Sequence, residues 1–125
     1  LRAIELVDVQ NMDNERLQQY IRKLLQHHGF RVESNNNPGN STLDIVARKN
    51  GIKYAVQVKR QISAISKEAV INAIAEKNRH NCNAAIVITN SYFTNDAIQL
   101  ARSEGCKLVD RDDLAVWIRD FKQKE

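Results

Sequence analysis

Three polar side chains that suit metal and phosphate chemistry fall at neighbouring positions of one predicted β-hairpin. Two alternating strand-like runs, 43–48 and 52–59, flank an Asn50-Gly51 pair. Asn-Gly is typical of a two-residue hairpin turn, because both central residues must accept positive φ. That turn places Asp44 opposite Gln57, with Cβ atoms about 5 Å apart, and Lys59 diagonally on the same face.

These residue types match the needs of a hard divalent cation. Mg²⁺ prefers carboxylate and carbonyl oxygens, which Asp44, the Gln57 amide and the backbone carbonyl of Val58 would supply. Lys59 would orient or deprotonate an attacking water and offset charge on a phosphorane-like transition state. The alternative explanation is an exposed hairpin with one diagonal Asp–Lys pair, which contributes little to stability.

The remaining elements indicate an α/β domain built around this hairpin. The hairpin's other face is apolar, and a short strand at 30–33 precedes it. Helices are predicted from Asp13 to His28, from Ser66 to about residue 79, from Thr94 to Gly105 and from Asp110 onward. A buried strand at 84–89 and a short strand at 107–109 complete the order αβββαβαβα, a mixed sheet flanked by helices.

Length and composition indicate one globular domain over residues 1–125, with 1–11 as an N-terminal extension. The chain has 42% hydrophobic and 27% charged residues and a net charge of +4, which permits but does not require nucleic-acid binding. Because Leu1 is the first residue, we expect a domain excised from a longer chain, and an upstream domain or membrane anchor is left open.

Several classes of protein are excluded or disfavoured by what the sequence lacks. No apolar run approaches the roughly 18 residues of a membrane helix, so we expect no membrane contact within these residues. Two cysteines cannot form a disulfide framework, and we expect two reduced thiols in a cytoplasmic protein. No Gly-rich phosphate loop or Ser/His/Asp set is visible, which argues against an NTPase or a serine hydrolase.

The order of elements and the spacing of short motifs resemble a known nuclease superfamily. Leu43-Asp44-Ile45-Val46-Ala47 is followed by Tyr54-Ala-Val-Gln-Val-Lys-Arg60, then Ile88-Thr-Asn-Ser-Tyr-Phe-Thr94 and Leu108-Val-Asp-Arg111. This pattern, from about Met12 to Ile118, is similar to the PD-(D/E)xK nucleases. Within them the chain resembles the Mrr-like restriction endonuclease family, in which Gln-x-Lys replaces Asp/Glu-x-Lys.

The resemblance implies a restriction-endonuclease-like fold and a Mg²⁺-dependent DNA endonuclease, with Mn²⁺ able to substitute. Asp44 would then be the metal-binding carboxylate, Gln57 the second ligand and Lys59 the catalytic lysine. The partner would be DNA, and the protein would be prokaryotic and nucleoid-associated. Cutting both strands would require two sites, most simply from a homodimer.

Two departures from the family pattern keep other functions open. Gln18 stands where the family often has a first-helix Glu, and Asn40 stands where its loop commonly carries an acid. A catalytically silent DNA-binding or interaction module with the nuclease fold is therefore one alternative. A structure-selective nuclease like the archaeal Holliday-junction resolvases is another, although those typically carry Glu-x-Lys.

Four further residues are predicted to contact DNA. Arg60 follows the candidate lysine directly, and Arg48 and Lys53 lie at the far end of the hairpin, where basic groups would hold phosphates. Asn90 follows a buried strand end, a place where α/β sheets often bind ligands.

Overall fold

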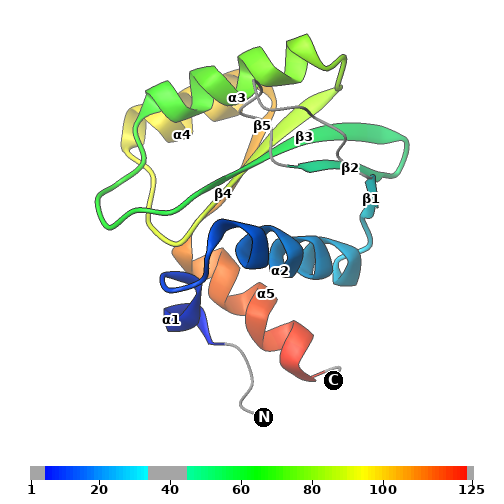
Figure 1. Cartoon of the computed structure of the whole chain (residues 1–125). Coiled ribbons are helices and arrows are strands. Elements are labelled where there is room, and N and C mark those ends of the chain that lie inside the picture. Colours follow the sequence, from blue (N-terminus) through cyan, green and yellow to red (C-terminus); the bar gives the residue numbers. More distant parts are fainter. Residues whose placement is uncertain (1–4, 34–44, 124–125) are drawn as a thin grey trace.

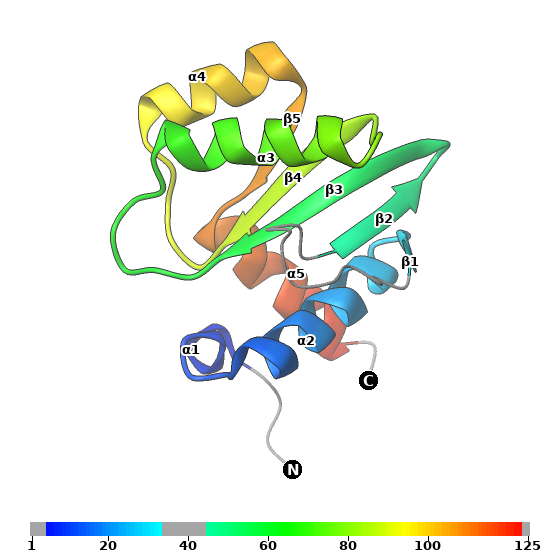
Figure 2. The ribbon, with the colours of Figure 1, turned by 45° about the horizontal axis from the view of Figure 1, so that its top comes forward.

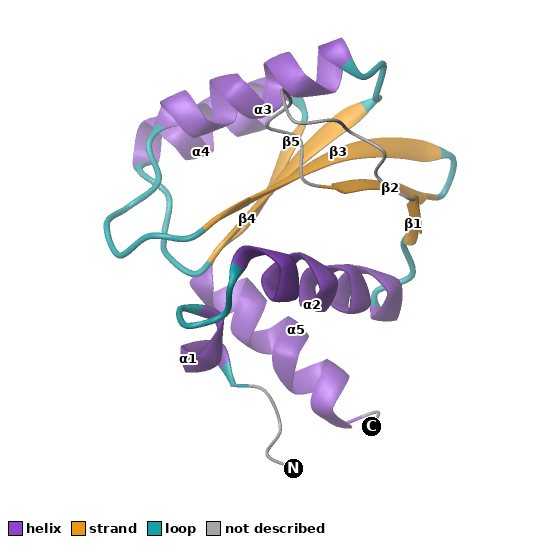
Figure 3. Ribbon diagram, in the orientation of Figure 1, coloured by secondary structure: helices purple, strands orange, loops and turns teal. Residues whose placement is uncertain are grey.

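A mixed five-stranded sheet forms the centre of the molecule (Figures 1 and 3). The structure is a computed structural model and describes residues 5–33 and 45–123. The strands are β1 Arg31–Glu33, β2 Ile45–Lys49, β3 Ile52–Lys59, β4 Ala84–Thr89 and β5 Cys106–Val109. They lie in the sheet in chain order; β1–β2 and β2–β3 pair antiparallel, and β3–β4 and β4–β5 pair parallel. The predicted mixed sheet is therefore confirmed.

Helices cover both faces of this sheet (Figures 1 and 2). The helices are α1 Leu6–Val9, α2 Asn14–His27, α3 Lys67–Arg79, α4 Asn95–Glu104 and α5 Arg111–Gln123. α2 and α5 lie on one face, and α3 and α4 lie on the other. The short helix α1 falls inside the predicted N-terminal extension and was not predicted from the sequence.

The Asn-Gly turn fixes the register of the central hairpin as predicted. Asn50 and Gly51 have φ angles of +53° and +80°, the positive values that a tight hairpin turn of this kind requires. The pairing runs from Lys49 opposite Ile52 to Ile45 opposite Val56. Because successive side chains alternate between the two faces of a sheet, this register determines on which face each residue of β3 lies.

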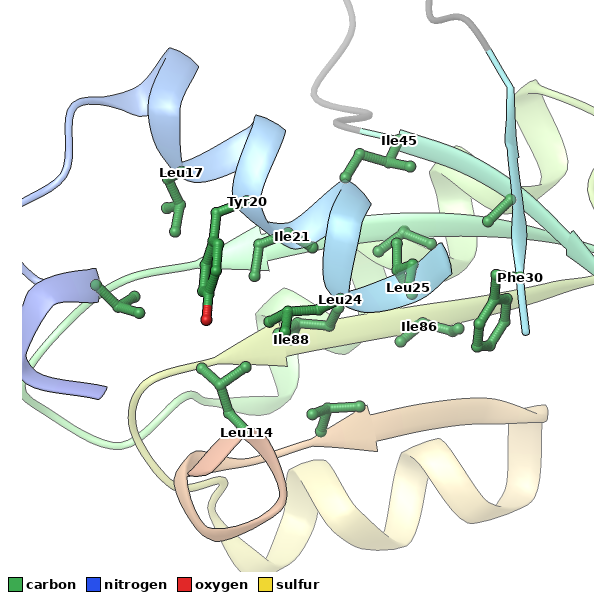
Figure 4. Close-up of a cluster of buried hydrophobic side chains, with 14 of the residues drawn as sticks. Leu17, Tyr20, Ile21, Leu24, Leu25, Phe30, Ile45, Ile86, Ile88 and Leu114 are labelled. Carbon is green, nitrogen blue, oxygen red and sulfur yellow. The ribbon is translucent and has the colours of Figure 1, made fainter. Parts of the chain in front are cut away.

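The larger hydrophobic core lies between the sheet and the α2–α5 layer (Figure 4). Leu24 and Leu25 of α2 are fully buried there against Ile45, Ile86 and Ile88 of the strands. A smaller cluster on the other face joins Val87 and Cys106 of the sheet to small residues of α3 and α4. Each large buried aliphatic side chain stabilises the fold by about 1.5–3 kcal/mol, so both layers hold the central strands firmly in place.

Helix ends follow the local signals in the sequence. The Asp13 side chain accepts a hydrogen bond from the Arg16 amide at 2.8 Å, and the Thr94 side chain accepts one from the Ala97 amide at 3.3 Å. α4 ends at Gly105, whose φ is +68°. No helix in the described part of the chain is long and apolar enough to cross a membrane.

Candidate active site

Gln57 and Lys59 project from the same face of β3, near its carboxyl end. They are two residues apart and pair with Val87 and Thr89 of the parallel strand β4. Val87 packs against residues of α3 and α4, and neighbouring residues in a ladder share a face. Gln57 and Lys59 are therefore directed to the α3–α4 side of the sheet. The alternation in the sequence predicted that they share a face, but not which helices lie on that side.

This face is not the open surface that the exposed-hairpin explanation assumes. The Gln57 residue is only 1% exposed, and Ala55 on the same face is fully buried. Burying an amide is unfavourable unless it is hydrogen-bonded, and an apolar residue would suit a purely structural position better. A buried glutamine beside a lysine thus favours a polar site over simple packing.

The Lys59 side chain is only partly exposed at the end of the strand. Within residues 5–33 and 45–123 its ammonium group has no hydrogen-bond or salt-bridge partner among the interactions of the structure. An ammonium group beside a buried amide can donate to a phosphate oxygen or to a water molecule. The arrangement therefore supplies a positive charge where a phosphodiester could approach.

The proposed metal ligands lie only partly within the described residues. Asp44 and Asn40 lie outside them, and the described register ends at Ile45 opposite Val56. Val58 lies between Gln57 and Lys59 and pairs with Ile88. The described residues contain no cluster of three or more His, Cys, Asp or Glu that could hold a metal. The two candidate ligands that are described, Gln57 and Val58, offer an amide and a carbonyl oxygen. Such oxygen ligands fit a hard cation such as Mg²⁺ rather than zinc.

Arg60 is engaged by the protein itself. Its guanidinium group donates to the backbone carbonyl of Val9 at 3.0 Å, to the carbonyl of Met12, and to Asn14 Oδ1 at 2.8 Å. These contacts join the end of β3 to the end of α1, to the connection that follows it, and to the start of α2. The sequence did not predict this intramolecular role, since the acceptors lie about 50 residues away; the predicted DNA contact of Arg60 stays a prediction.

Arg48 and Lys53 lie at the opposite end of the hairpin from Lys59. They face each other across β2 and β3, and six residues of strand separate Lys53 from Lys59, which is about 20 Å. Arg48 Nε also contacts Glu33 Oε2 at 2.6 Å, and the contact with Arg48 lowers the pKa of that carboxyl group. The structure therefore does not bring these two basic residues together with Lys59.

Gln18 and Asn90 occupy different surroundings. Gln18 belongs to α2, which covers the face of the sheet opposite to Gln57 and Lys59. Asn90 follows β4 directly and is 4% exposed; its Oδ1 accepts a hydrogen bond from the Gln61 amide at 3.1 Å. Asn90 therefore lies at the same carboxyl edge of the sheet as Lys59, where the prediction placed it.

One buried acid was missed by the sequence analysis. Glu76 of α3 is 4% exposed, and its carboxylate contacts Arg79 Nη1 at 3.3 Å and His80 Nε2 at 3.1 Å. The signal was the position of Glu76 one turn after Ala73 on the packed face of the helix, together with the i, i+4 spacing to His80.

Comparisons with known proteins bear on the family and the fold of this chain. The family model Mrr_cat, described as a restriction endonuclease, matches residues 9–118. No curated protein matches the sequence. Three similar solved structures are a protein of unknown function, AF1548, the DNA modification-dependent restriction endonuclease AspBHI, and the MspJI restriction endonuclease in complex with a 27-mer oligonucleotide.

These structures share the fold at low sequence identity. AF1548 is 21% identical with a TM-score of 0.65, and the match covers 74% of this chain and 55% of that one. AspBHI is 11% identical with a TM-score of 0.71, covering 96% and 39%. MspJI is 16% identical with a TM-score of 0.60, covering 91% and 30%. The chain thus spans roughly half or less of the length of each of these proteins.

Proposed function

Because this chain belongs to the Mrr_cat restriction endonuclease family, we propose that it is a metal-dependent endonuclease domain that hydrolyses DNA phosphodiester bonds. One observation carries the proposal: buried Gln57 and partly exposed Lys59 share one face at the carboxyl end of β3. A lysine without a partner in the described part of the chain is available to a phosphate.

Each residue has a distinct proposed role. Asp44, the Gln57 amide oxygen and the Val58 carbonyl would hold Mg²⁺ or Mn²⁺, and a bound divalent ion polarises a phosphate and activates water. Lys59 donates to the phosphate oxygens and orients the attacking water. Gln57 is neutral, so we expect weak metal affinity that improves when the substrate phosphate adds negative charge.

DNA is the proposed substrate, and its recognition is proposed to involve more than this domain. The family assignment and the fold shared with MspJI, which is solved with an oligonucleotide, support DNA as the partner. The chain covers 30% of MspJI and 39% of AspBHI, so additional domains would select the sequence or modification. A two-fold dimer would supply the second site needed to cut both strands.

The test is cleavage of supercoiled plasmid with Mg²⁺ or Mn²⁺, compared with EDTA. Lys59→Ala should abolish nicking and linearisation while leaving folding nearly intact. Lys23→Ala is the matched control, because Lys23 is an exposed residue of α2 and its replacement removes the same charge. Equal cleavage by wild type and Lys59→Ala would refute the catalytic role of Lys59.

A catalytically silent DNA-binding module is the second candidate function. It is favoured by Gln18 and Asn40, which stand where the family often carries acidic residues. Salt-sensitive DNA binding without cleavage in any metal would support it. If cleavage does occur, preference for branched over linear DNA would instead indicate a junction-resolving nuclease.

A further inference from the structure

A pair of adjoining cavities lies at the carboxyl edge of β3 and β4, beside but distinct from the Lys59 face. Both are lined by Gln10, Gln61, Ile62 and Asn90, and their volumes are about 340 and 220 Å³. Arg60 completes the larger cavity, and Tyr92 and Arg111 contribute to the smaller one. We propose that this recess, which we call the edge cavity, binds an unstacked nucleobase of the DNA substrate. The proposal rests on the proposed DNA nuclease function and adds a base-binding subsite to it.

The lining matches the chemistry of a nucleobase. A base has two flat apolar faces and an edge of hydrogen-bond donors and acceptors, and primary amides pair with such edges. The described lining includes three primary amides, two arginines and an isoleucine, and it includes no carboxylate. The volume of the larger cavity exceeds that of a single base, so the base can enter together with part of its sugar.

Asn90 is an oriented donor within this cavity. The residue is 4% exposed. Its Oδ1 accepts a hydrogen bond from the backbone N–H of Gln61 at 3.1 Å, and its backbone carbonyl accepts one from Arg111 Nη1 at 3.1 Å. The amide nitrogen makes no hydrogen bond within the described part of the chain. Because the acceptor end is held by the backbone, the Nδ2 group is left to donate to a ring nitrogen or carbonyl of a base.

Ile62 is the apolar partner at the rim of the cavity. It is 92% exposed, the highest value among the large hydrophobic residues of the described chain. Yet its loop is fixed: Ser91 Oγ donates to the carbonyls of Ile62 and Ser63 at 3.2 and 2.8 Å. Gln61 Nε2 also donates to the carbonyls of Ser63 and Ala64, at 3.1 and 3.0 Å.

A rigid loop that presents an exposed isoleucine is preorganised for contact. Apolar side chains, isoleucine among them, are inserted between base steps to separate stacked bases in DNA. Ile62 lies three residues after Lys59, so a strand held at Lys59 passes close to the edge cavity. This position favours DNA over a protein partner as the occupant.

The experiment compares base-bearing and abasic single strands of equal length. Fluorescein-labelled homopolymers of dT, dA and dC, and a matched strand of abasic residues, are titrated with the full chain in EDTA and followed by anisotropy. All four strands carry the same phosphates, so charge attraction is equal. Since each stacked base contributes about 1–3 kcal/mol, we expect at least one base-bearing strand to bind at least about fivefold more tightly than the abasic strand.

Two variants assign this difference to the edge cavity. Asn90→Asp keeps an acceptor for the backbone N–H of Gln61 but removes the Nδ2 donor. Ile62→Ala removes the apolar side chain at the rim. Both variants should reduce the ratio of the affinity for base-bearing strands to that for the abasic strand to about one. Any charge effect of Asn90→Asp weakens the binding of base-bearing and abasic strands equally and leaves this ratio unchanged. Ile71→Ala is the control, because Ile71 is a 49% exposed isoleucine on α3 and lies outside the cavity lining.

The outcomes separate this proposal from the nuclease proposal. Equal wild-type affinity for base-bearing and abasic strands, or a base preference that both variants retain, would overturn the edge cavity as a base site. Base-dependent binding that the variants lose would support it even in a protein that does not cleave plasmid. Plasmid cleavage without any base preference would support the nuclease and refute the subsite.

Discussion

The contacts of Arg60 predict that its main effect is on stability. Replacing Arg60 with Ala removes hydrogen bonds to the carbonyls of Val9 and Met12 and to Asn14 Oδ1. Val9 and Met12 are 2% and 5% exposed, so water does not readily replace the lost donors. Hydrogen bonds from charged groups contribute about 1.5–3 kcal/mol each. Counting the two carbonyl bonds at the low end, the free energy of unfolding should fall by about 3 kcal/mol.

Urea unfolding of wild type and Arg60→Ala measures this loss directly. We expect a lower midpoint with an unchanged m-value, because the surface exposed on unfolding stays the same. A loss of about 3 kcal/mol corresponds to a fall in Tm of roughly 10 °C for a domain of this size. The urea midpoint of Arg60→Lys should lie between those of wild type and Arg60→Ala, since one ammonium group cannot reach all three acceptors as a planar guanidinium does.

Arg102→Ala is the matched control for this experiment. Arg102 is an exposed residue of α4 without a partner in the described part of the chain, so its replacement should leave stability nearly unchanged. The reasoning is refuted if Arg60→Ala unfolds at the wild-type midpoint. If such a variant also loses DNA affinity, Arg60 would be a phosphate contact rather than a structural clamp.

Three further predictions concern pH, packing and the metal site. Burial, and next the charge of neighbouring His27, lowers the pKa of His28 below its ordinary 6.5. His28 therefore does not reduce the free energy of unfolding above pH 6.5. Below that pH the free energy of unfolding falls, because the unfolded chain takes up a proton that the folded chain does not. Chemical unfolding at pH 7 and pH 5.5 should show this loss, and His28→Gln should reduce it; an identical pH dependence in that variant would contradict the assignment. Leu24→Ala should destabilise the fold by about 3–5 kcal/mol, because Leu24 is fully buried, and a loss below about 1 kcal/mol by urea unfolding would contradict its place in the core. Gln57→Glu should tighten Mn²⁺ binding by adding a charge, and an unchanged calorimetric titration would mean that Gln57 is not a ligand.

Local chemistry explains why much of the fold was predictable from the sequence. Asn50-Gly51 selects a tight turn, which then assigns Gln57 and Lys59 to one face by alternation alone. Asp13 and Thr94 cap helices through amides only three residues away. Such signals require no knowledge of distant parts of the chain.

Tertiary contacts explain what the sequence analysis missed. The acceptors of Arg60 are separated from it by 46 to 51 residues, so nothing near Arg60 in the sequence marks it as a clamp. Gln57 is 1% exposed, and the hairpin pattern, which assigns only the face of its side chain, does not encode this burial. The same is true of α2, the helix that contains Gln18, which covers the other face of the sheet. The faces of strands were predictable, but the partners that cover them were not.

The loops that leave β3 and β4 are joined just before their helices begin. The Ile65 amide donates to the Tyr92 carbonyl at 2.7 Å, and the Thr94 amide donates to the Ile65 carbonyl at 3.0 Å. Residues 61–64 are therefore bounded by two fixed points, the Arg60 clamp on one side and the Ile65–Phe93 bridge on the other. Between these points the loop is held by the side chains of Gln61 and Ser91, which donate to its backbone carbonyls. For protein engineering, the side chains at positions 62–64 are therefore the ones to exchange in order to change the surface beside the candidate active site, while the starts of α3 and α4 keep their positions.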